Sequence, residues 1–257
     1  MFDKARAPLR SRLDAADALA VSWLAMGSVA MVEAAARARP DAIVLDLQHG
    51  LFDRRDLEAA IGVVPRDVPV LVRVAENAAT AIGAALDAGA EGVIVPLVET
   101  AEQAEAAARY ARFPPHGVRS GGGVRPLADF GAYVSAAERG TVVIVMIETL
   151  EGLENAEAIA AARGVDMVFI GTGDLALCLG SGEDAARRHA ESCAAIRAAC
   201  ERAGTPCGVF TGTLDAALAR REEGYRMVVA ANDVELVSRG FREAAEAFAQ
   251  PKRGRAR

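Results

Sequence analysis

The apolar residues of the chain fall into eight short runs that alternate with longer segments of helical spacing. The runs are rich in β-branched residues and lack polar alternation, which is typical of parallel strands buried on both faces. The first strand is expected within Ala16–Met26, ending near Gly27. The other seven are expected at Ala42–Leu45, Val68–Val72, Gly92–Val95, Val142–Ile147, Met167–Ile170, Pro206–Phe210 and Arg226–Ala230.

The intervening segments repeat apolar residues at helical spacing and often end at glycine or proline. The predicted helices are Ser28–Arg39, Arg54–Val64, Ala78–Ala88, Ala101–Arg112, Asp129–Arg139, Leu150–Arg163, Ala185–Ala203, Leu214–Glu223 and Val234–Ala249. Eight strand-then-helix units predict a closed (β/α)8 TIM barrel. We expect one barrel domain over residues 1–250 and a basic, disordered tail over 251–257. An open doubly wound sheet is the alternative, but no Gly-x-Gly-x-x-Gly follows the first strand.

Composition narrows the class of protein. The chain has 257 residues, of which 52% are hydrophobic, and can bury a large core without disulfides. Its net charge of −6 argues against nucleic acid as a partner. No apolar run approaches the roughly 18 residues of a membrane span, and the first residues lack the apolar region of a secretory signal. We therefore expect a soluble cytoplasmic enzyme with no membrane partner.

The four cysteines do not form a Cys-x-x-Cys pair. A zinc knuckle or a thioredoxin-like site is therefore disfavoured. Cys193 and Cys200 lie on one face of a predicted helix, which favours buried structural thiols over a redox role.

Two carboxylates follow neighbouring predicted strands. Glu148 comes directly after the fifth strand, and Asp174 follows the sixth. Carboxylates at the carboxyl ends of adjacent parallel strands suit a divalent cation such as Mg²⁺ or Mn²⁺. The alternative is that Glu148 caps the next helix and Asp174 caps a turn.

Asp46 and His49 follow the second strand in a tight polar turn. A histidine there suits proton transfer, and Asp46 could orient its ring. Alternatively, both residues only stabilise the turn. His116 and His189 fall in a loop and on a charged helix, where solvated roles are expected.

Arg73 ends the third strand, so that five polar candidates converge at one end of the barrel. Its guanidinium suits a carboxylate or a developing enolate oxygen. The alternative is a buried salt bridge to Asp46 or Glu148. Residues 171–180 form a glycine-rich turn whose N–H groups could hold a substrate carboxylate or phosphate. The loop Pro114–Pro126 is either a lid or a plain surface loop.

At these residues the chain resembles the HpcH/HpaI aldolase/citrate lyase family, in its metal-dependent (class II) pyruvate aldolase branch. The similar stretches are LDLQHG (45–50), LVRV (71–74), LDAGAEGVIVPLVETAEQAE (86–105), RFPPHGVRS (112–120), MIET (146–149) and GVDMVFIGTGDLALCLG (164–180). They cover most of the expected barrel, which would then be of the phosphoenolpyruvate/pyruvate-binding type.

The resemblance implies a divalent metal, Mg²⁺, Mn²⁺ or Co²⁺, held by Glu148 and Asp174. Pyruvate would chelate that metal through its keto and carboxylate oxygens. Arg73 would steady the carbonyl that becomes the enolate. His49 would serve in acid–base transfer through a metal-bound water, supported by Asp46.

The resemblance also implies a larger assembly. Asp87 matches an acidic position that in relatives approaches the site of a neighbouring subunit. The family usually forms a hexamer, a trimer of dimers, in which a C-terminal helix is exchanged between subunits. Val234–Ala249 would be that helix here.

Two positions depart from the family pattern. Met146 stands where the best-known members have a glutamine that helps to hold the pyruvate carboxylate. Gly171, Thr172 and Gly173 precede Asp174, where relatives have Gly-Pro-Ala/Ser. These residues are expected to bind substrate. Thr172 is either a replacement hydrogen-bond donor or a sign of an altered carboxylate site.

The expected activity is a reversible cleavage of 4-hydroxy-2-oxo acids to an aldehyde and pyruvate, or a close 2-oxo acid such as hydroxypyruvate, through a metal-stabilised enolate. Lys4 and Lys252 are the only lysines and lie in the terminal segments, which argues against a Schiff-base mechanism. The alternatives are a CoA-ester lyase of the citrate-lyase-β type and a non-catalytic barrel that binds an oxo acid.

Overall fold

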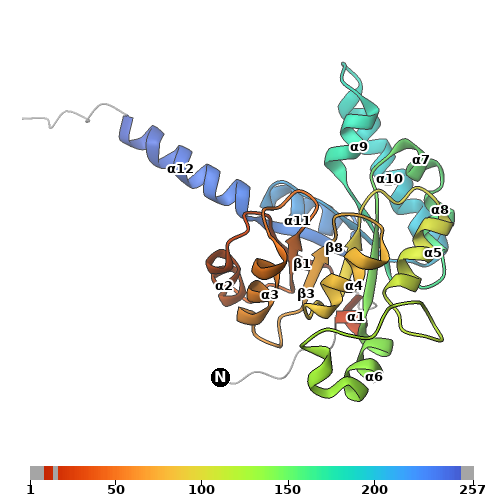
Figure 1. The fold of residues 1–257 in the computed structure, drawn as a ribbon. Helices are drawn as coiled ribbons and strands as arrows, with labels where there is room; N and C mark the ends of the chain where they lie inside the picture. Colours follow the sequence, from red (N-terminus) through yellow and green to blue (C-terminus); the bar gives the residue numbers. More distant parts are fainter. Residues whose placement is uncertain (1–8, 14–16, 250–257) are drawn as a thin grey trace, which may run out of the picture.

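A computed structural model describes residues 9–13 and 17–249 of the chain. Within this part, eight parallel strands form a closed barrel in the order β1 to β8, and helices surround it (Figure 1). The strands are β1 (Leu19–Leu24), β2 (Ala42–Asp46), β3 (Val70–Arg73), β4 (Gly92–Val95), β5 (Val142–Ile147), β6 (Met167–Ile170), β7 (Cys207–Val209) and β8 (Met227–Asn232). The predicted (β/α)8 barrel is confirmed.

The helices follow the expected rhythm. They are α1 (Leu9–Leu13), α2 (Val29–Arg37), α3 (Arg54–Val63), α4 (Ala79–Asp87), α5 (Ala101–Tyr110), α6 (Phe130–Gly140), α7 (Leu150–Glu154), α8 (Ala156–Ala160), α9 (Thr172–Leu179), α10 (Ala185–Ala203), α11 (Leu214–Glu222) and α12 (Asp233–Ala249), with a 3₁₀ turn at Pro126–Asp129. Side chains of serine, threonine or aspartate accept a backbone N–H at the starts of α2, α3, α5, α6, α7 and α11.

Two expectations about these helices were wrong. The segment predicted as one helix over 150–163 is two short helices, α7 and α8, divided at Asn155. The Asn155 side chain donates to the Glu99 carbonyl, which ties this break to the loop after β4. The segment after β6, predicted as a glycine-rich turn, forms the two-turn helix α9.

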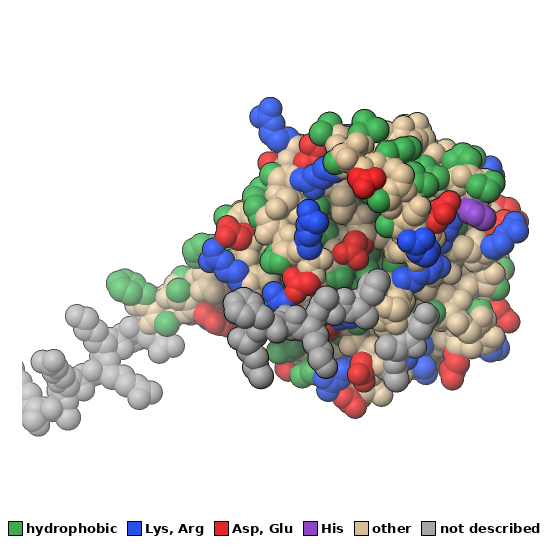
Figure 2. Space-filling view, turned by 90° about the horizontal axis from the view of Figure 1, so that it is seen from below, with side chains coloured by type: hydrophobic (Ala, Val, Ile, Leu, Met, Phe, Trp, Pro, Cys, Tyr) green, Lys and Arg blue, Asp and Glu red, His purple; other side chains and the backbone are tan. Residues whose placement is uncertain are grey.

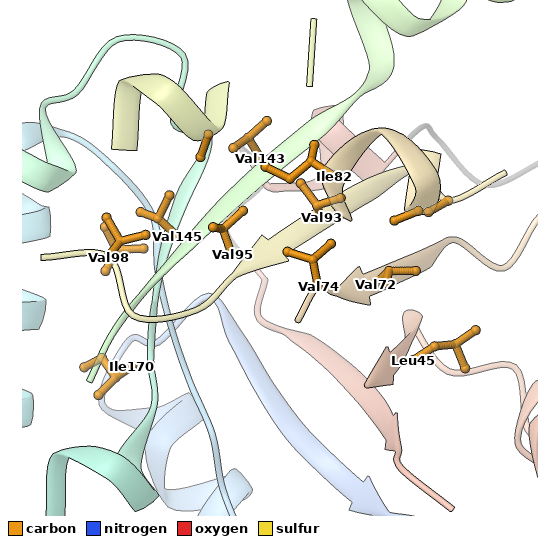
Figure 3. Packing of buried hydrophobic residues seen from close by; sticks show 14 of the residues in the cluster. Leu45, Val72, Val74, Ile82, Val93, Val95, Val98, Val143, Val145 and Ile170 are labelled. Carbon is orange, nitrogen blue, oxygen red and sulfur yellow. The ribbon is translucent and has the colours of Figure 1, made fainter. Parts of the chain in front are cut away.

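Alternate residues of each strand belong to two separate cores. Val143, Val145 and Ile147 of β5 point outward and pack with β4 residues and with Ile82 of α4 (Figure 3). Ile144 and Met146 point into the barrel, where Trp23 stacks on Phe169 with ring centroids 5.8 Å apart. This period of two decides which residues at the strand ends face the barrel axis.

The long connection between α5 and β5 lies at the end of the barrel where the strands begin, because it follows a helix rather than a strand. Arg125 in this connection donates to two backbone carbonyls, those of Ala88 at the end of α4 and of Glu58 in α3. The loop Pro114–Pro126, considered above as a lid, therefore lies at the opposite end of this barrel from Asp46, Arg73 and Glu148, which end or follow strands. Figure 1 shows α6 and α9 at opposite ends.

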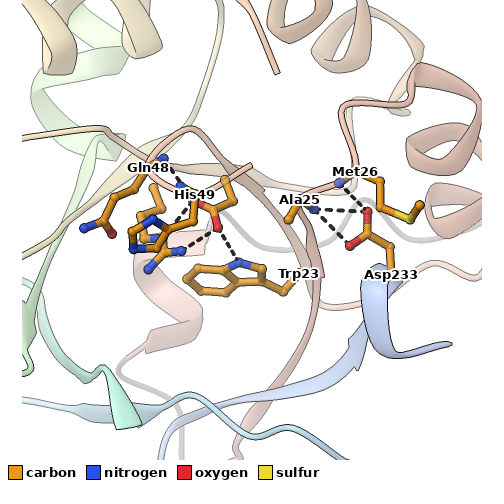
Figure 4. A network of polar contacts seen from close by, with 8 residues as sticks. Trp23, Ala25, Met26, Gln48, His49 and Asp233 are labelled. Carbon is orange, nitrogen blue, oxygen red and sulfur yellow. Dashed lines mark hydrogen bonds and ion pairs between the residues drawn. The ribbon is translucent and has the colours of Figure 1, made fainter. Parts of the chain in front are cut away.

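Helix α12 projects away from the barrel, and only its first residue, Asp233, is buried (Figure 1). The Asp233 carboxylate accepts the backbone N–H groups of Ala25 and Met26 and so anchors the helix to the loop after β1 (Figure 4). No helix in the described residues has the length and apolarity needed to cross a membrane. The tail at 251–257 lies outside the described residues.

The cysteines are free thiols. Cys193, Cys200 and Cys207 are buried, as expected for structural thiols, whereas Cys178 on α9 is exposed.

Candidate active site

Asp46 and Arg73 form a buried ion pair at the carboxyl ends of β2 and β3. The two residues are register partners in the sheet. Arg73 donates from Nε to Asp46 Oδ1 over 2.8 Å and from Nη2 to Oδ2 over 2.5 Å. The indole N–H of Trp23 donates to Oδ2 from below, and the Arg73 guanidinium lies 5.1 Å from the Trp23 ring centroid. The predicted alternative of a buried salt bridge is therefore present, and it fixes the orientation of Arg73.

The pKa of Asp46 reflects a balance of opposing effects. Burial acts to raise this pKa, but hydrogen bonding and charge attraction from Arg73 outweigh it, and the net pKa lies below its ordinary value. The backbone N–H groups of Gln48 and His49 also donate to Oδ1. The carboxylate is thus held ionised, with its oxygens satisfied.

His49 is exposed at the rim of the barrel, next to Gln48 in the turn (Figure 4). Asp46 Oδ1 accepts the backbone N–H of His49 and forms no hydrogen bond with the imidazole ring. The expectation that Asp46 orients the imidazole is therefore wrong for this structure. Within the described residues the ring forms no hydrogen bond, which leaves both nitrogens available to a substrate or water.

Glu148 is buried directly after β5, in line with the inward-facing Ile144 and Met146. Its Oε1 accepts the Leu97 N–H over 2.8 Å. Leu97 has a φ of 53°, a conformation rare for residues other than glycine, and this aims its N–H at the carboxylate. Thr149, not Glu148, caps α7, so the capping alternative for Glu148 is wrong.

Burial is the main cause that raises the pKa of Glu148. The Leu97 N–H opposes this rise, the Asp174 carboxylate adds to it, and the Arg73 guanidinium opposes it. Glu148, Asp174 and Arg73 are therefore close enough to act on one another's charge. Arg73 ends β3, Glu148 follows β5 and Asp174 lies in the first turn of α9, so residues from three parts of the chain meet at one end of the barrel.

Helix α9 carries Asp174 in its first turn and begins against Glu148. A Cβ atom on Gly171 would lie 2.1 Å from Glu148 Oε2, so only glycine fits here. Asp174 lies in the first turn of α9 and accepts no backbone N–H within the described residues, so the alternative that it caps a turn also fails. The N–H groups at the start of a helix lack partners within it, and here they belong to Thr172, Gly173 and Asp174. The Thr172 hydroxyl donates to the Phe210 carbonyl and is not free to replace another donor.

His189 supports this helix, a role that the sequence reasoning missed. Its Nε2 lies 3.0 Å from the Thr172 carbonyl and 3.9 Å from Cys193 Sγ. The available signal was spacing, because His189 lies one helical turn before the buried Cys193 on α10 and so shares its inward face.

Asp87 lies away from this cluster within the chain. It closes α4 at the end where the strands begin, and its Oδ1 accepts Nη2 of the buried Arg119 over 2.7 Å. The guanidinium of Arg119 also packs against the rings of Phe113 and Tyr133. Asp87 can thus take part in catalysis only at the site of another copy.

A model of the HpcH/HpaI aldolase/citrate lyase family matches residues 19–239. The chain belongs to this family. It is 36% identical over 251 residues to a hydroxypyruvate/pyruvate aldolase of Paraburkholderia phytofirmans, covering 92% of this chain and 95% of that relative. It is 37% identical over 235 residues to a 4-hydroxy-2-oxovalerate aldolase of Rhodococcus jostii, covering 89% and 90%.

A solved structure of an HpcH/HpaI aldolase/citrate lyase family protein from Burkholderia cenocepacia superposes with a TM-score of 0.87 at 34% identity. The match covers 94% of this chain and 99% of that one. Together with the aldolases named above, this identifies the chain as a carbon–carbon lyase of the HpcH/HpaI family, as the sequence predicted.

In this HpcH/HpaI barrel the donor set suits a divalent cation that keeps open positions. Within residues 9–13 and 17–249, no group of three or more His, Cys, Asp or Glu side chains is arranged to hold a metal. Mg²⁺ is commonly bound by one or two carboxylates together with substrate and water oxygens. Glu148 fits that pattern, because it is buried near the Asp174 carboxylate and packs closely against Gly171.

Proposed function

We propose that the chain is a metal-dependent aldolase that cleaves 4-hydroxy-2-oxo acids reversibly to an aldehyde and pyruvate, or a close 2-oxo acid such as hydroxypyruvate. The observation that carries this proposal is the meeting of Glu148, Asp174 and Arg73 at the barrel mouth. Two carboxylates supply oxygen ligands, and a fixed guanidinium supplies a positive charge for a developing enolate.

Glu148 and Asp174 are the residues that would hold the metal ion, Mg²⁺, Mn²⁺ or Co²⁺. When bound there, such an ion acts as a Lewis acid toward the keto oxygen of the substrate. Burial, with the charge of Asp174 adding to it, raises the pKa of Glu148, and a bound cation would offset both effects.

The N-terminus of α9 is proposed to bind the substrate carboxylate. The N–H groups of Thr172 and Gly173 form no hydrogen bond within the described part of the chain, and the start of a helix favours a negative charge. Gly171 brings this helix start against Glu148, so the carboxylate and keto oxygens of one 2-oxo acid can reach the same region.

Arg73 is proposed to stabilise charge on the keto oxygen. Its Nε and Nη2 are committed to Asp46, while Nη1 forms no hydrogen bond within the described residues. When a base takes the C4 hydroxyl proton, the O–H electrons form the aldehyde carbonyl and the C3–C4 bonding electrons form the C2–C3 double bond. The keto oxygen then carries the negative charge of the enolate. A positioned donor of this kind is typically worth 10²–10³-fold in kcat.

His49 is proposed to complete the cycle by giving a proton to C3, directly or through water, which forms the methyl group of pyruvate. Its exposed position and free ring allow it to exchange that proton with solvent. Asp46 supports this role through the backbone of the turn, since it holds the His49 N–H.

Met146 lies below Glu148 inside the barrel and is almost fully buried. An apolar side chain there cannot hold a carboxylate, which leaves the α9 N–H groups as the proposed carboxylate site. Because the carboxylate can bind at α9, methionine at position 146 is not an argument for the non-catalytic, oxo-acid-binding barrel.

A CoA-ester lyase is less well supported. Of the arginines considered for the CoA phosphates, Arg119 and Arg125 lie at the opposite end of the barrel, bonded to Asp87 and to helix carbonyls. Arg73 is buried against Asp46. The mouth thus offers no basic groove formed by these residues.

We further propose a cytoplasmic hexamer, a trimer of dimers, in which α12 packs on a neighbouring copy. Helix α12 leaves Val234, Phe241 and Phe248 exposed, with Phe248 at 94%. The neighbour would also bring Asp87 to the site.

The test is pyruvate release coupled to lactate dehydrogenase. Purified protein is given 4-hydroxy-2-oxo acids with Mg²⁺, Mn²⁺ or Co²⁺, and then with EDTA. We expect metal-dependent release that is lost in Glu148→Ala and Asp174→Ala. Release that is unaffected by EDTA, or no release with any metal, would contradict the proposal.

A further inference from the structure

A cavity of about 820 Å³ opens at the end of the barrel opposite the catalytic carboxylates. It is bounded by the last turns of α5 and α6, by α1 and by the loop before β6. Figure 2 views the molecule from this end and shows Lys or Arg side chains in blue and Asp or Glu side chains in red on its surface. The charged and titratable residues that line the cavity are Arg10, Arg109, Arg112, Arg139, Arg163, His116, Glu105 and Glu138.

The backbone around this cavity is held firmly. The loop after α5 folds back on the helix end, where Val118 N–H donates to the Arg109 carbonyl and Arg119 N–H to the Arg112 carbonyl. A Cβ atom on Gly117 would lie 2.3 Å from both of these carbonyl oxygens. Glycine at 117 therefore lets the loop close on α5, which sets the positions of Arg109 and Arg112.

Two of the arginines share one carboxylate. Arg10 is ion-paired with Asp166, and Arg112 Nη2 lies 3.5 Å from the other oxygen of the same group. Gly164, with φ of 89°, lets the chain pass close to the Arg112 guanidinium. The single negative charge of Asp166 is thus shared by two of the guanidinium groups that line the cavity.

The other three arginines, Arg109, Arg139 and Arg163, are exposed and form no ion pair or hydrogen bond within the described residues. Glu105 and Glu138 likewise have no partner there. Positive charge is therefore in excess around this cavity, although the chain as a whole carries −6. Clustered like charges repel one another unless an anion lies between them.

We propose that this cavity binds a small molecule carrying at least two phosphate groups. Guanidinium groups match phosphate oxygens with paired N–H donors, and five of them surround one space. The volume lies within the range of small-molecule sites. Glu105 and Glu138 can accept hydrogen bonds from hydroxyl groups of such a ligand. Neither Glu148 nor Asp174 lines the cavity, so this site is separate from the catalytic mouth.

The test is isothermal titration of the full-length protein with inorganic pyrophosphate, at about 0.15 M salt and without added divalent metal. We expect wild-type protein to bind, and Arg109→Ala/Arg163→Ala to bind at least roughly tenfold more weakly, since two charge-assisted contacts are lost. Both positions are exposed, so the fold should persist. The matched control is Arg55→Ala/Arg66→Ala, two exposed arginines outside the cavity, which should bind like wild type.

Three results would overturn the proposal. These are no binding by the wild-type protein, equal loss in the control variant, and unchanged affinity in Arg109→Ala/Arg163→Ala. The last result would place the anion elsewhere on the protein, for example at the catalytic mouth.

Discussion

Arg73 reaches both carboxylate oxygens of Asp46 through Nε and Nη2, at 2.8 and 2.5 Å, and both side chains are at least nine-tenths buried. Paired side-on donation of this kind fixes the plane of the guanidinium. Because Asp46 and Arg73 end adjacent strands in register, the sheet itself sets their approach. The sheet and the ion pair together therefore fix the orientation of the Arg73 guanidinium.

We predict that Asp46→Asn destabilises the protein by about 3–5 kcal/mol, because it leaves Arg73 as a buried cation without its anion. We expect kcat to fall by about 10²–10³-fold as Arg73 loses its fixed position. Urea unfolding and the pyruvate-release assay measure these effects.

The matched control is Glu58→Gln, which breaks the exposed Arg54–Glu58 pair on α3. Exposed pairs contribute little, so its unfolding free energy should change by less than about 1 kcal/mol. Equal destabilisation by both substitutions would mean that the Asp46–Arg73 pair has no special structural role.

The Asp46–Arg73 pair also makes the free energy of unfolding depend on pH, and the lowered pKa of Asp46 fixes the direction of that dependence. The folded-state pKa of Asp46 is lowered below its ordinary value of 3.8. Its contribution to stability is therefore fully present above that value and is lost as pH falls through the folded pKa. The difference in unfolding free energy between wild type and Asp46→Asn should be constant near neutrality and should shrink below about pH 4. A difference that grows on acidification would contradict the assignment.

Gly171 gives a prediction about Glu148, the carboxylate that we propose holds the metal. In Gly171→Ala the new methyl group would collide with Glu148 Oε2, so Glu148 or α9 must move. We expect activity to fall by at least about 10²-fold, since misplacement by 1 Å can cost that much.

The control for Gly171 is Gly83→Ala in α4, where a Cβ meets nothing within 4 Å. Alanine is the better helix former there, so stability should stay equal or rise by up to about 1 kcal/mol. Full activity in Gly171→Ala would show that the position of Glu148 against Gly171 is not critical for activity.

The barrel could be predicted from the sequence because it depends on the short-range alternation of apolar runs with segments of helical spacing. Which strand-end residues face the barrel axis was not predicted, because strands buried on both faces show no polar alternation. In the structure, Asp46, Arg73 and Glu148 share the parity of inward residues on their strands. The hydrogen-bonding partners of these side chains could not be predicted from the sequence. Whether Arg73 pairs with Asp46 or with Glu148 depends on strand register. His189 contacts Thr172 only because α10 packs on α9.

Two segments show where composition alone does not decide the structure. Residues 171–180 were expected to form a glycine-rich turn, but residues 172–179 form α9, which gains its stability from packing, with Leu175 fully buried. The loop Pro114–Pro126 was considered as a lid from its glycines and arginines, although its place after a helix puts it at the other end of the barrel. Packing outweighed composition at α9, and topology outweighed it at the loop.

The projecting helix α12 gives a prediction about assembly. Phe241→Asp/Phe248→Asp places charges on its apolar face, so we expect a smaller species in light scattering after size-exclusion chromatography. The control, Arg239→Glu/Glu243→Arg, reverses an ion pair on the other face of the helix and should leave the mass unchanged. An unchanged mass in the Phe variant would mean that α12 does not join subunits.

The most direct test of the proposed enolate chemistry is proton–deuterium exchange at the pyruvate methyl group, followed by ¹H NMR in D₂O with Mg²⁺. It needs no knowledge of the aldehyde. We expect wild-type protein and Glu151→Gln, a nearby exposed carboxylate, to exchange the methyl protons. Exchange should stop in EDTA and in Glu148→Gln, and should slow strongly in His49→Ala. No exchange by the wild type, or exchange that persists in Glu148→Gln, would contradict the proposed site.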